Sequence, residues 1–139
     1  MPIEEFDHYT VRAADFDASW RFYGEVLGLR CVTRTGTPHR AAFIYFEPGD
    51  KWLVHLAEAP REEVAALPKF EGDRKTGAFL HIATNAHGLK EMKARLEQHG
   101  WPYRERNLDA RSLRQLHLLD PDGIEIEINF PLSEYTGEA

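Results

Sequence analysis

The chain has 139 residues, the length of one ordinary domain, and its 42% hydrophobic and 29% charged residues are typical of a globular protein. Its formal net charge of -6 argues against broad nucleic-acid binding, and its single cysteine, Cys31, excludes an internal disulfide and a cysteine-rich zinc site. The N-terminus is acidic, and no stretch approaches the roughly 18 apolar residues of a membrane span. We therefore expect a cytoplasmic protein without nucleic-acid or membrane partners.

The first half of the chain predicts a strand, a helix and three further strands. The first strand is predicted over residues 6–11. In the helix that follows, Trp20, Tyr23 and Leu27 recur at helical spacing, and Gly28 marks its end. Three strand-like segments come next, over residues 29–34, 41–46 and 52–56.

The second half repeats this order. A strand is predicted over 79–84, and Leu89, Met92 and Leu96 form the apolar stripe of a helix that Gly100 ends. Three strands then follow, over residues 103–105, 114–119 and 124–129.

A nearly constant spacing relates the two halves. His81 follows His8 by 73 positions (81 − 8), and Gly100 follows Gly28 by 72 (100 − 28). A fixed spacing indicates an internal repeat. The sequence therefore predicts two modules in one domain, over about 5–58 and 78–130. They are joined by a linker over about 59–77, and a polar tail prone to disorder follows over 131–139.

The repeat relates four possible metal ligands in pairs. His8 corresponds to His81, and His55 corresponds to Glu127 at a spacing of 72 (127 − 55). A lone strand histidine is more often structural, and a polar strand face often meets only water. A cluster of three histidines and a glutamate, however, would cost several kcal/mol per buried ion without a cation. Imidazole with carboxylate suits Fe, Ni, Co, Zn or Mn, so we expect one divalent metal ion.

The sequence resembles the vicinal oxygen chelate superfamily, also called the glyoxalase, bleomycin resistance protein and extradiol dioxygenase group. The likeness covers about residues 5–130. It is carried by Asp7-His8 and by three segments: SWRFYGEVLGL at 19–29, FLHIATN at 79–85 and LLDPDGIEIEI at 118–128.

The resemblance implies an α+β fold in which two paired βαβββ modules form an open, barrel-like sheet around a metal site, commonly in a homodimer. By position, His8, His81 and Glu127 match the usual metal ligands. His55 matches the fourth position, where glyoxalase-like members often carry Glu or Gln. Because this chain has His there, His55 is expected to be either a ligand or an acid/base residue.

The resemblance also implies a function. The first hypothesis is a glyoxalase-like lyase or isomerase, whose metal binds a small substrate through vicinal oxygens while His55 or Glu127 moves a proton. The alternative is an Fe(II) extradiol-type ring-cleaving dioxygenase, although most of these are about twice as long. A third hypothesis is a non-catalytic antibiotic-binding protein. Thiol transfer to fosfomycin is a related option, but the sequence has no clear potassium loop or phosphonate pocket.

A substrate pocket is predicted around the strand that precedes Glu127. His117, Gln115 and Arg114 are its expected lining residues. Arginines near this strand could meet an anionic substrate tail, but a solvated loop is the simpler interpretation of their clustering.

Overall fold

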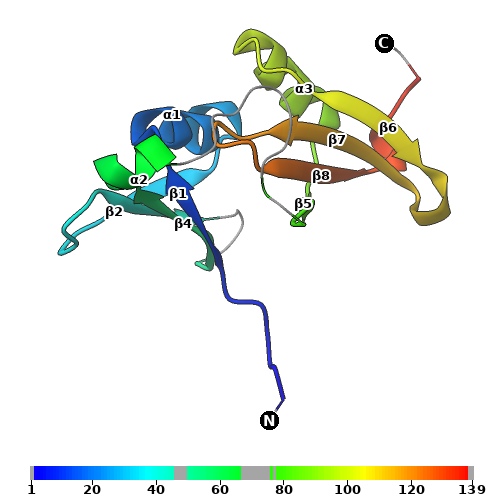
Figure 1. Cartoon of the computed structure of the whole chain (residues 1–139). Helices are drawn as coiled ribbons and strands as arrows, with labels where there is room; N and C mark the ends of the chain where they lie inside the picture. The colour runs from blue at the N-terminus through cyan, green and yellow to red at the C-terminus, as the bar shows by residue number, and fades with distance from the viewer. Residues whose placement is uncertain (1, 46–49, 67–75, 77, 138–139) are drawn as a thin grey trace. The chain divides into compact units, whose positions relative to one another are not determined.

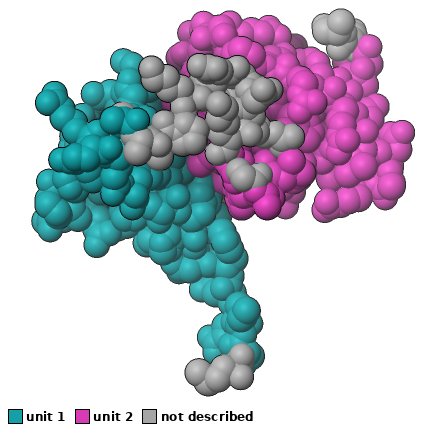
Figure 2. All heavy atoms as spheres, in the orientation of Figure 1, with its two compact units in different colours: residues 1–67 teal, residues 68–139 magenta. Residues whose placement is uncertain are grey.

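The computed structural model describes residues 2–45, 50–66, 76 and 78–137 (Figure 1). The chain divides into two compact units, Met1–Leu67 and Pro68–Ala139 (Figure 2). Each unit is described by itself below.

Unit 1 contains a four-stranded sheet in the order β1-β4-β3-β2. Its first and last strands, β1 and β4, pair in parallel, whereas the other neighbours are antiparallel. The elements in chain order are β1 (Tyr9–Ala13), α1 (Phe16–Arg21), the π-helical η1 (Phe22–Val26), β2 (Arg30–Arg34), β3 (Ala41–Tyr45), β4 (Trp52–Glu58) and α2 (Arg61–Ala66).

Unit 2 has the same topology. Its sheet runs β5-β8-β7-β6, with β5 and β8 parallel and the other pairs antiparallel. The elements are β5 (His81–Asn85), α3 (Leu89–Gln98), β6 (Arg104–Leu108), the 3-10 turn η2 (Asp109–Arg111), β7 (Leu113–Leu119), β8 (Glu125–Pro131) and the 3-10 turn η3 (Leu132–Glu134).

Strand register confirms the internal repeat. Thr10 pairs with His55 in unit 1, and Ala83 pairs with Glu127 in unit 2. These pairs are related by the same spacings, 73 and 72 positions, that the sequence indicates (83 − 10 and 127 − 55). The α+β class and the two βαβββ modules are therefore confirmed, and each sheet is open rather than a closed barrel.

One face of each sheet is apolar because strand side chains alternate. In unit 1 this face buries Val11, Ile44, Val54 and Leu56, and the buried Phe22 and Tyr23 lie on the adjoining helical segment. The Asp15 carboxylate caps α1 by accepting a hydrogen bond from the Ala18 amide over 3.0 Å.

In unit 2 the apolar side chains come from three elements. Leu116 and Leu118 of β7, Ile126 and Ile128 of β8, and Leu96 of α3 are all buried. The apolar layer thus fixes which face of β8 carries Glu125, Glu127 and Asn129.

Several predicted boundaries shift. The first strand, predicted over 6–11, begins only at Tyr9, so His8 lies just before it. The strand predicted over 79–84 begins at His81, and Phe79 and Leu80 are exposed. Residue 46, at the end of the strand predicted over 41–46, lies outside the described residues. These shifts leave the repeat intact.

The predicted linker and tail contain structure. Helix α2 lies within residues 59–77, where the sequence analysis predicts only a linker. The predicted tail begins inside β8, which runs to Pro131, and continues through η3. Glu134 there accepts hydrogen bonds from the amides of Gly88 and Leu89, over 2.9 and 2.8 Å. Glu134 of η3 therefore caps the start of α3.

No helix within the described ranges has both the length and the apolar character needed to cross a membrane.

Candidate functional site

The second face of the unit 2 sheet is polar yet buried. Glu125, Glu127 and Asn129 of β8 are only 6%, 5% and 4% exposed. Burying carboxylates in this way is costly unless hydrogen bonds, charges or a cation compensate. The sequence analysis allows that a polar strand face merely meets water, and the burial of these three residues excludes that interpretation for β8.

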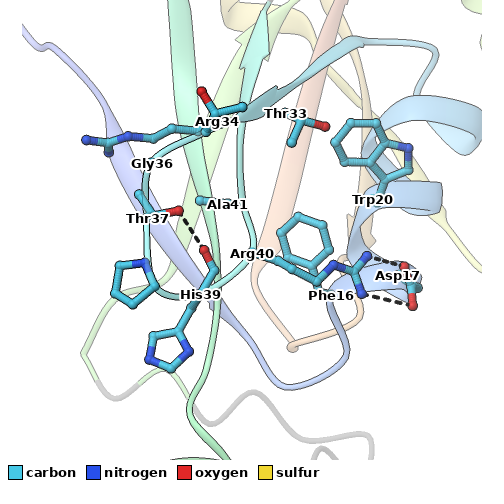
Figure 3. Close-up of a pocket in the computed structure, with 12 residues that line it drawn as sticks. Phe16, Asp17, Trp20, Thr33, Arg34, Gly36, Thr37, His39, Arg40 and Ala41 are labelled. Atoms are coloured by element: carbon cyan, nitrogen blue, oxygen red, sulfur yellow. Dashed lines mark hydrogen bonds and ion pairs between the residues drawn. The ribbon is translucent and has the colours of Figure 1, made fainter.

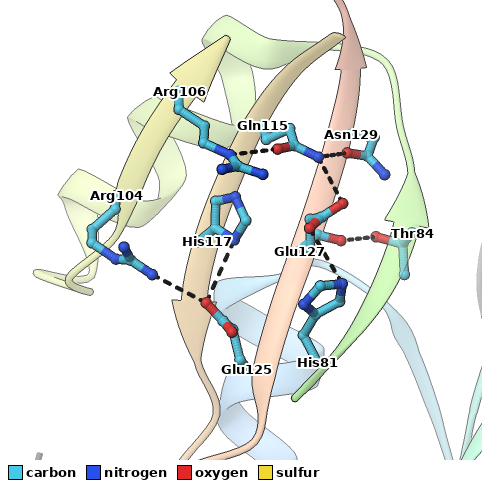
Figure 4. Close-up of polar contacts among 9 residues, drawn as sticks. All are labelled: His81, Thr84, Arg104, Arg106, Gln115, His117, Glu125, Glu127 and Asn129. Carbon is cyan, nitrogen blue, oxygen red and sulfur yellow. Dashed lines mark hydrogen bonds and ion pairs between the residues drawn. The ribbon is translucent and has the colours of Figure 1, made fainter. Parts of the chain in front are cut away.

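Gln115 organises this face (Figure 4). Its Nε2 donates to Glu127 Oε1 over 2.7 Å and to Asn129 Oδ1 over 2.8 Å. Its Oε1 accepts a hydrogen bond from Arg106 Nε over 2.8 Å. Since both ends of this fully buried amide are engaged, the Glu127 carboxylate is held in one orientation.

The free side of that carboxylate lies beside a histidine. Glu127 Oε2 is 3.4 Å from His81 Nε2, and the His81 side chain is 32% exposed. The two residues come from β8 and from the start of β5. Imidazole nitrogen and carboxylate oxygen presented together are two of the donors that divalent transition metals take in proteins.

A second carboxylate lies two residues earlier on β8. Glu125 Oε1 accepts from Arg104 over 3.1 Å and lies 3.5 Å from His117 Nδ1. The His117 side chain is only 10% exposed, and its Nε2 has no hydrogen-bond partner within the part of the chain described. Burial lowers the pKa of His117, whereas the neighbouring Glu127 and Glu125 oppose this decrease.

Two hollows meet at this face. One, of about 240 Å³, is lined by polar residues that include His81, Glu125 and Glu127. The other, of about 410 Å³, is mainly apolar, and its walls include Trp101, Tyr103, Leu119 and Pro121. Arg104 and His117 line both hollows.

In unit 1 the equivalent face is aromatic. The rings of His8 and His55 lie 6.3 Å apart between centroids, and Trp52 lies 4.7 Å from His8 and 6.3 Å from His55. Phe43 lies 5.6 Å from His55, and an Arg34 guanidinium nitrogen lies 3.4 Å from His55 Nε2. Burial lowers the pKa of His55, and Arg34 and His8 lower it further by repelling a proton.

The structure does not bring Arg114 to the polar face with Gln115 and His117. Because it is adjacent to Gln115 on β7, its side chain points to the opposite face. There it contacts Glu105 at 2.7 Å, and its guanidinium carbon lies 3.9 Å from the centre of the Tyr135 ring. Arg104 and Arg106, two of the arginines for which the sequence analysis weighs an anionic substrate tail against a solvated loop, reach the polar face instead.

Unit 1 also contains a hollow that the sequence analysis does not predict (Figure 3). It has a volume of about 620 Å³ and lies between α1 and the segment from β2 to β3. Arg40 contacts both the Asp17 carboxylate and the Phe16 ring there. The loop residues that line this hollow show no sequence pattern that would indicate a pocket.

Transition-metal sites in proteins are built from three or four side-chain donors. Within the described residues, no group of three or more His, Cys, Asp or Glu side chains is placed to hold one. The four ligands that the sequence predicts lie instead in two pairs, His8 with His55 in unit 1 and His81 with Glu127 in unit 2. Their chemistry fits a divalent transition metal, and register relates the two pairs by the repeat.

Comparisons with known proteins identify relatives of two kinds. The chain is 26% identical to a lactoylglutathione lyase of Schizosaccharomyces pombe over 92% of its own length, and it spans only 48% of that protein. It is 28% identical to glutathione transferase FosA of Serratia marcescens, over 91% of this chain and 81% of the transferase.

Among solved structures, the fold matches TnmS3, an antibiotic binding protein from Streptomyces sp. CB03234, with a TM-score of 0.68. Identity there is 21%, with 94% of this chain and 98% of the other covered. A family model matches residues 5–128, which is most of the chain. On this match, the protein belongs to the Glyoxalase/Bleomycin resistance protein/Dioxygenase superfamily.

Proposed function

We propose that this protein is a divalent-metal-dependent lyase or isomerase of the glyoxalase-like type. Its substrate is a small molecule that chelates the metal through vicinal oxygens. His8, His81 and Glu127 are the proposed ligands, and His55 occupies the fourth position as ligand or acid/base residue.

The observation that carries this proposal is the His81–Glu127 pair. A buried carboxylate, fixed on one oxygen by Gln115, presents its other oxygen 3.4 Å from an imidazole nitrogen. Hydrogen-bonded supporting residues of this kind typically orient metal ligands. The repeat adds His8 and His55 as the equivalent pair in unit 1.

Two of the relatives support an enzyme. One is a lyase and the other a transferase, both with glutathione in their names, at 26% and 28% identity. These identities support catalysis by this chain more strongly than they support any particular substrate.

The chain's own residues have distinct roles in the proposed reaction. A bound divalent metal would stabilise negative charge that develops on the substrate oxygens. His55 or Glu127 would accept a proton from the substrate, and burial lowers the pKa of His55, which favours its neutral, proton-accepting form. Gln115 holds Glu127 in a single orientation.

Metal binding by single variants tests the proposal. We expect about one equivalent of metal in protein purified without chelator, measured by mass spectrometry. His8→Ala, His81→Ala and Glu127→Ala should each abolish binding while circular dichroism stays native. His99→Ala, at an exposed helix end, is the matched control. Unchanged metal content in all three variants would refute the ligand assignment.

The fourth position needs its own variant. His55→Ala should weaken metal binding if His55 is a ligand, and should keep metal but lose turnover if it transfers a proton. Full metal content with full activity would remove His55 from the site.

The metal content of the native protein separates the alternative functions. Retention of Fe(II) alone would favour the ring-cleaving dioxygenase, and no metal uptake would favour a small-molecule binding protein.

We also propose that the chain forms a homodimer, as many members of the superfamily do. Sedimentation equilibrium tests this directly. A mass of one chain at all concentrations would contradict the proposed dimer.

A further inference from the structure

Arg34 places a positive charge beside His55 in unit 1. One of its guanidinium nitrogens, Nη1, lies 3.4 Å from His55 Nε2, and its guanidinium carbon lies 5.4 Å from the centre of the Phe43 ring. Within the described residues this guanidinium contacts no carboxylate, whereas Arg104 of unit 2 is paired with Glu125. Because a guanidinium has five N–H donors and no acceptor, those that His55 does not use are available to an anion.

The sheet face beside Arg34 is apolar and aromatic although it is not buried. Strand register places Val32, Phe43 and His55 side by side across β2, β3 and β4. Val32 is 38% exposed, and Phe43 and His55 are half-buried. The half-buried Trp52 lies against them, with its ring centre 4.4 Å from that of Phe43. Apolar side chains that gather on one exposed face often mark a ligand-binding surface.

One small molecule can reach both the charge and the rings. Arg34 follows Val32 by two residues on β2, so both side chains point to the same face of the sheet. The planar fork of guanidinium donors matches the two oxygens of a carboxylate. The rings of Phe43 and Trp52 offer a surface against which a flat aromatic group can pack.

We propose that this face of unit 1 binds a small aromatic anion, whose carboxylate pairs with Arg34 and whose ring lies against Phe43 and Trp52. Arg34 is therefore a specificity-determining residue. The inference rests on the proposed function for the role of this anion as substrate, because His8 and His55 of the same face belong to the proposed metal site. Binding itself requires only residues of unit 1.

A matched pair of probes separates the charge from the aromatic contact. 2-Naphthoate and 2-naphthamide have the same ring system and nearly the same shape, but only 2-naphthoate is charged. Both are titrated into chelator-treated, ¹⁵N-labelled protein and followed by NMR. We expect 2-naphthoate to bind about tenfold more tightly, which is the lower end of the usual effect of a hydrogen bond to a charged group. We also expect it to shift the Arg34 Nε–H resonance.

Two variants assign the binding to its residues. Arg34→Gln should abolish the difference between the probes, while 2-naphthamide still binds as it does to the native protein. Arg21→Gln, at an exposed position of α1, removes the same charge elsewhere in unit 1 and is the matched control. Phe43→Leu should weaken both probes by about two- to tenfold, because the contact between aromatic rings is lost. If Arg34→Gln does not fold, the Arg34 resonance of the native protein decides.

Three results would overturn the inference: equal affinity of the two probes, a preference that survives in Arg34→Gln, or no binding of either probe. Because the titration uses metal-free protein, it is independent of the metal assay. A clear 2-naphthoate preference in a protein that takes up no metal would refute the proposed function and leave this binding site standing. Metal uptake without the preference would do the reverse.

Discussion

Gln115 Nε2 and Glu127 Oε1 are joined by a hydrogen bond of 2.7 Å between two side chains that are almost completely buried. The bond leaves the second carboxylate oxygen of Glu127 facing His81. A single amide on β7 therefore determines how the proposed ligand on β8 is presented.

The first prediction concerns this amide. Gln115→Leu should weaken metal binding by about 10- to 100-fold, as expected for loss of a residue that orients a ligand. It should also lower the free energy of unfolding of the metal-free protein by about 1–3 kcal/mol, because Asn129 and Glu127 lose a buried donor. Metal titration and urea denaturation measure the two effects. Gln98→Leu, at an exposed site on α3, is the control, and native metal affinity in Gln115→Leu would contradict the orienting role.

The second prediction concerns Glu105. Burial raises the pKa of Glu105, but hydrogen bonds from Lys93 and Arg114 lower it more, so the pKa ends below its ordinary value of 4.5. The unfolded chain therefore binds this proton more readily than the folded chain does. The stabilisation is complete above pH 4.5 and is lost as the pH falls through the folded-state pKa.

Glu105→Gln should therefore lower the free energy of unfolding by about 1–3 kcal/mol at neutral pH. The loss should shrink as the pH falls below 4.5. Denaturant titrations at several pH values measure this dependence. Glu4→Gln, at an exposed position, is the matched control. A loss that is equal at neutral and acidic pH would show that packing, and not the ionised carboxylate, is responsible.

The third prediction concerns Cys31. Burial raises the pKa of its thiol from 9.0 to about 11. Because only the thiolate reacts, the native protein near pH 8 should be alkylated by iodoacetamide about 100-fold more slowly than the unfolded chain. Mass spectrometry of timed samples, with and without denaturant, measures the rates. Equal rates would show that the thiol is accessible and ionises normally.

The fourth prediction concerns the capping of α3. Gly88, at the start of the helix, has no capping side chain of its own, and Glu134 instead accepts hydrogen bonds from two backbone amides there. Glu134→Ala should therefore lower the free energy of unfolding by about 1 kcal/mol. The hydrogen bond from the Leu89 amide is also the main reason why the pKa of Glu134 is lowered. Ser133→Ala, at an exposed position, is the control. Identical thermal and urea midpoints in the two variants would exclude the cap.

The repeat could be predicted because its signal is periodic. Equivalent residues such as Gly28 and Gly100 keep nearly one spacing, and the strand register reproduces it. Strand starts were less predictable. Phe79 is apolar but exposed. Because apolar residues are more often buried in strands and cores, the sequence pattern included Phe79 in the predicted strand, which therefore started too early.

Two further features could have been recognised from the sequence. Arg114 alternates with Gln115 along β7, so strict period-two geometry already places them on opposite faces. The segment after Pro60 has acidic residues in its first turn, the signature of a helix start that α2 confirms. That His117 Nε2 has no hydrogen-bond partner among the described residues could not be foreseen, because burial and hydrogen bonding depend on the neighbouring strands.

The strand order has a consequence for how each unit is completed. In each sheet the strand made last lies between two strands made earlier, β4 between β1 and β3, and β8 between β5 and β7. The first strand of each unit therefore has no neighbour until the last one has been synthesised. His55 and Glu127 lie on these last strands. During synthesis, each half of the proposed ligand set thus comes together in the same step that closes its sheet.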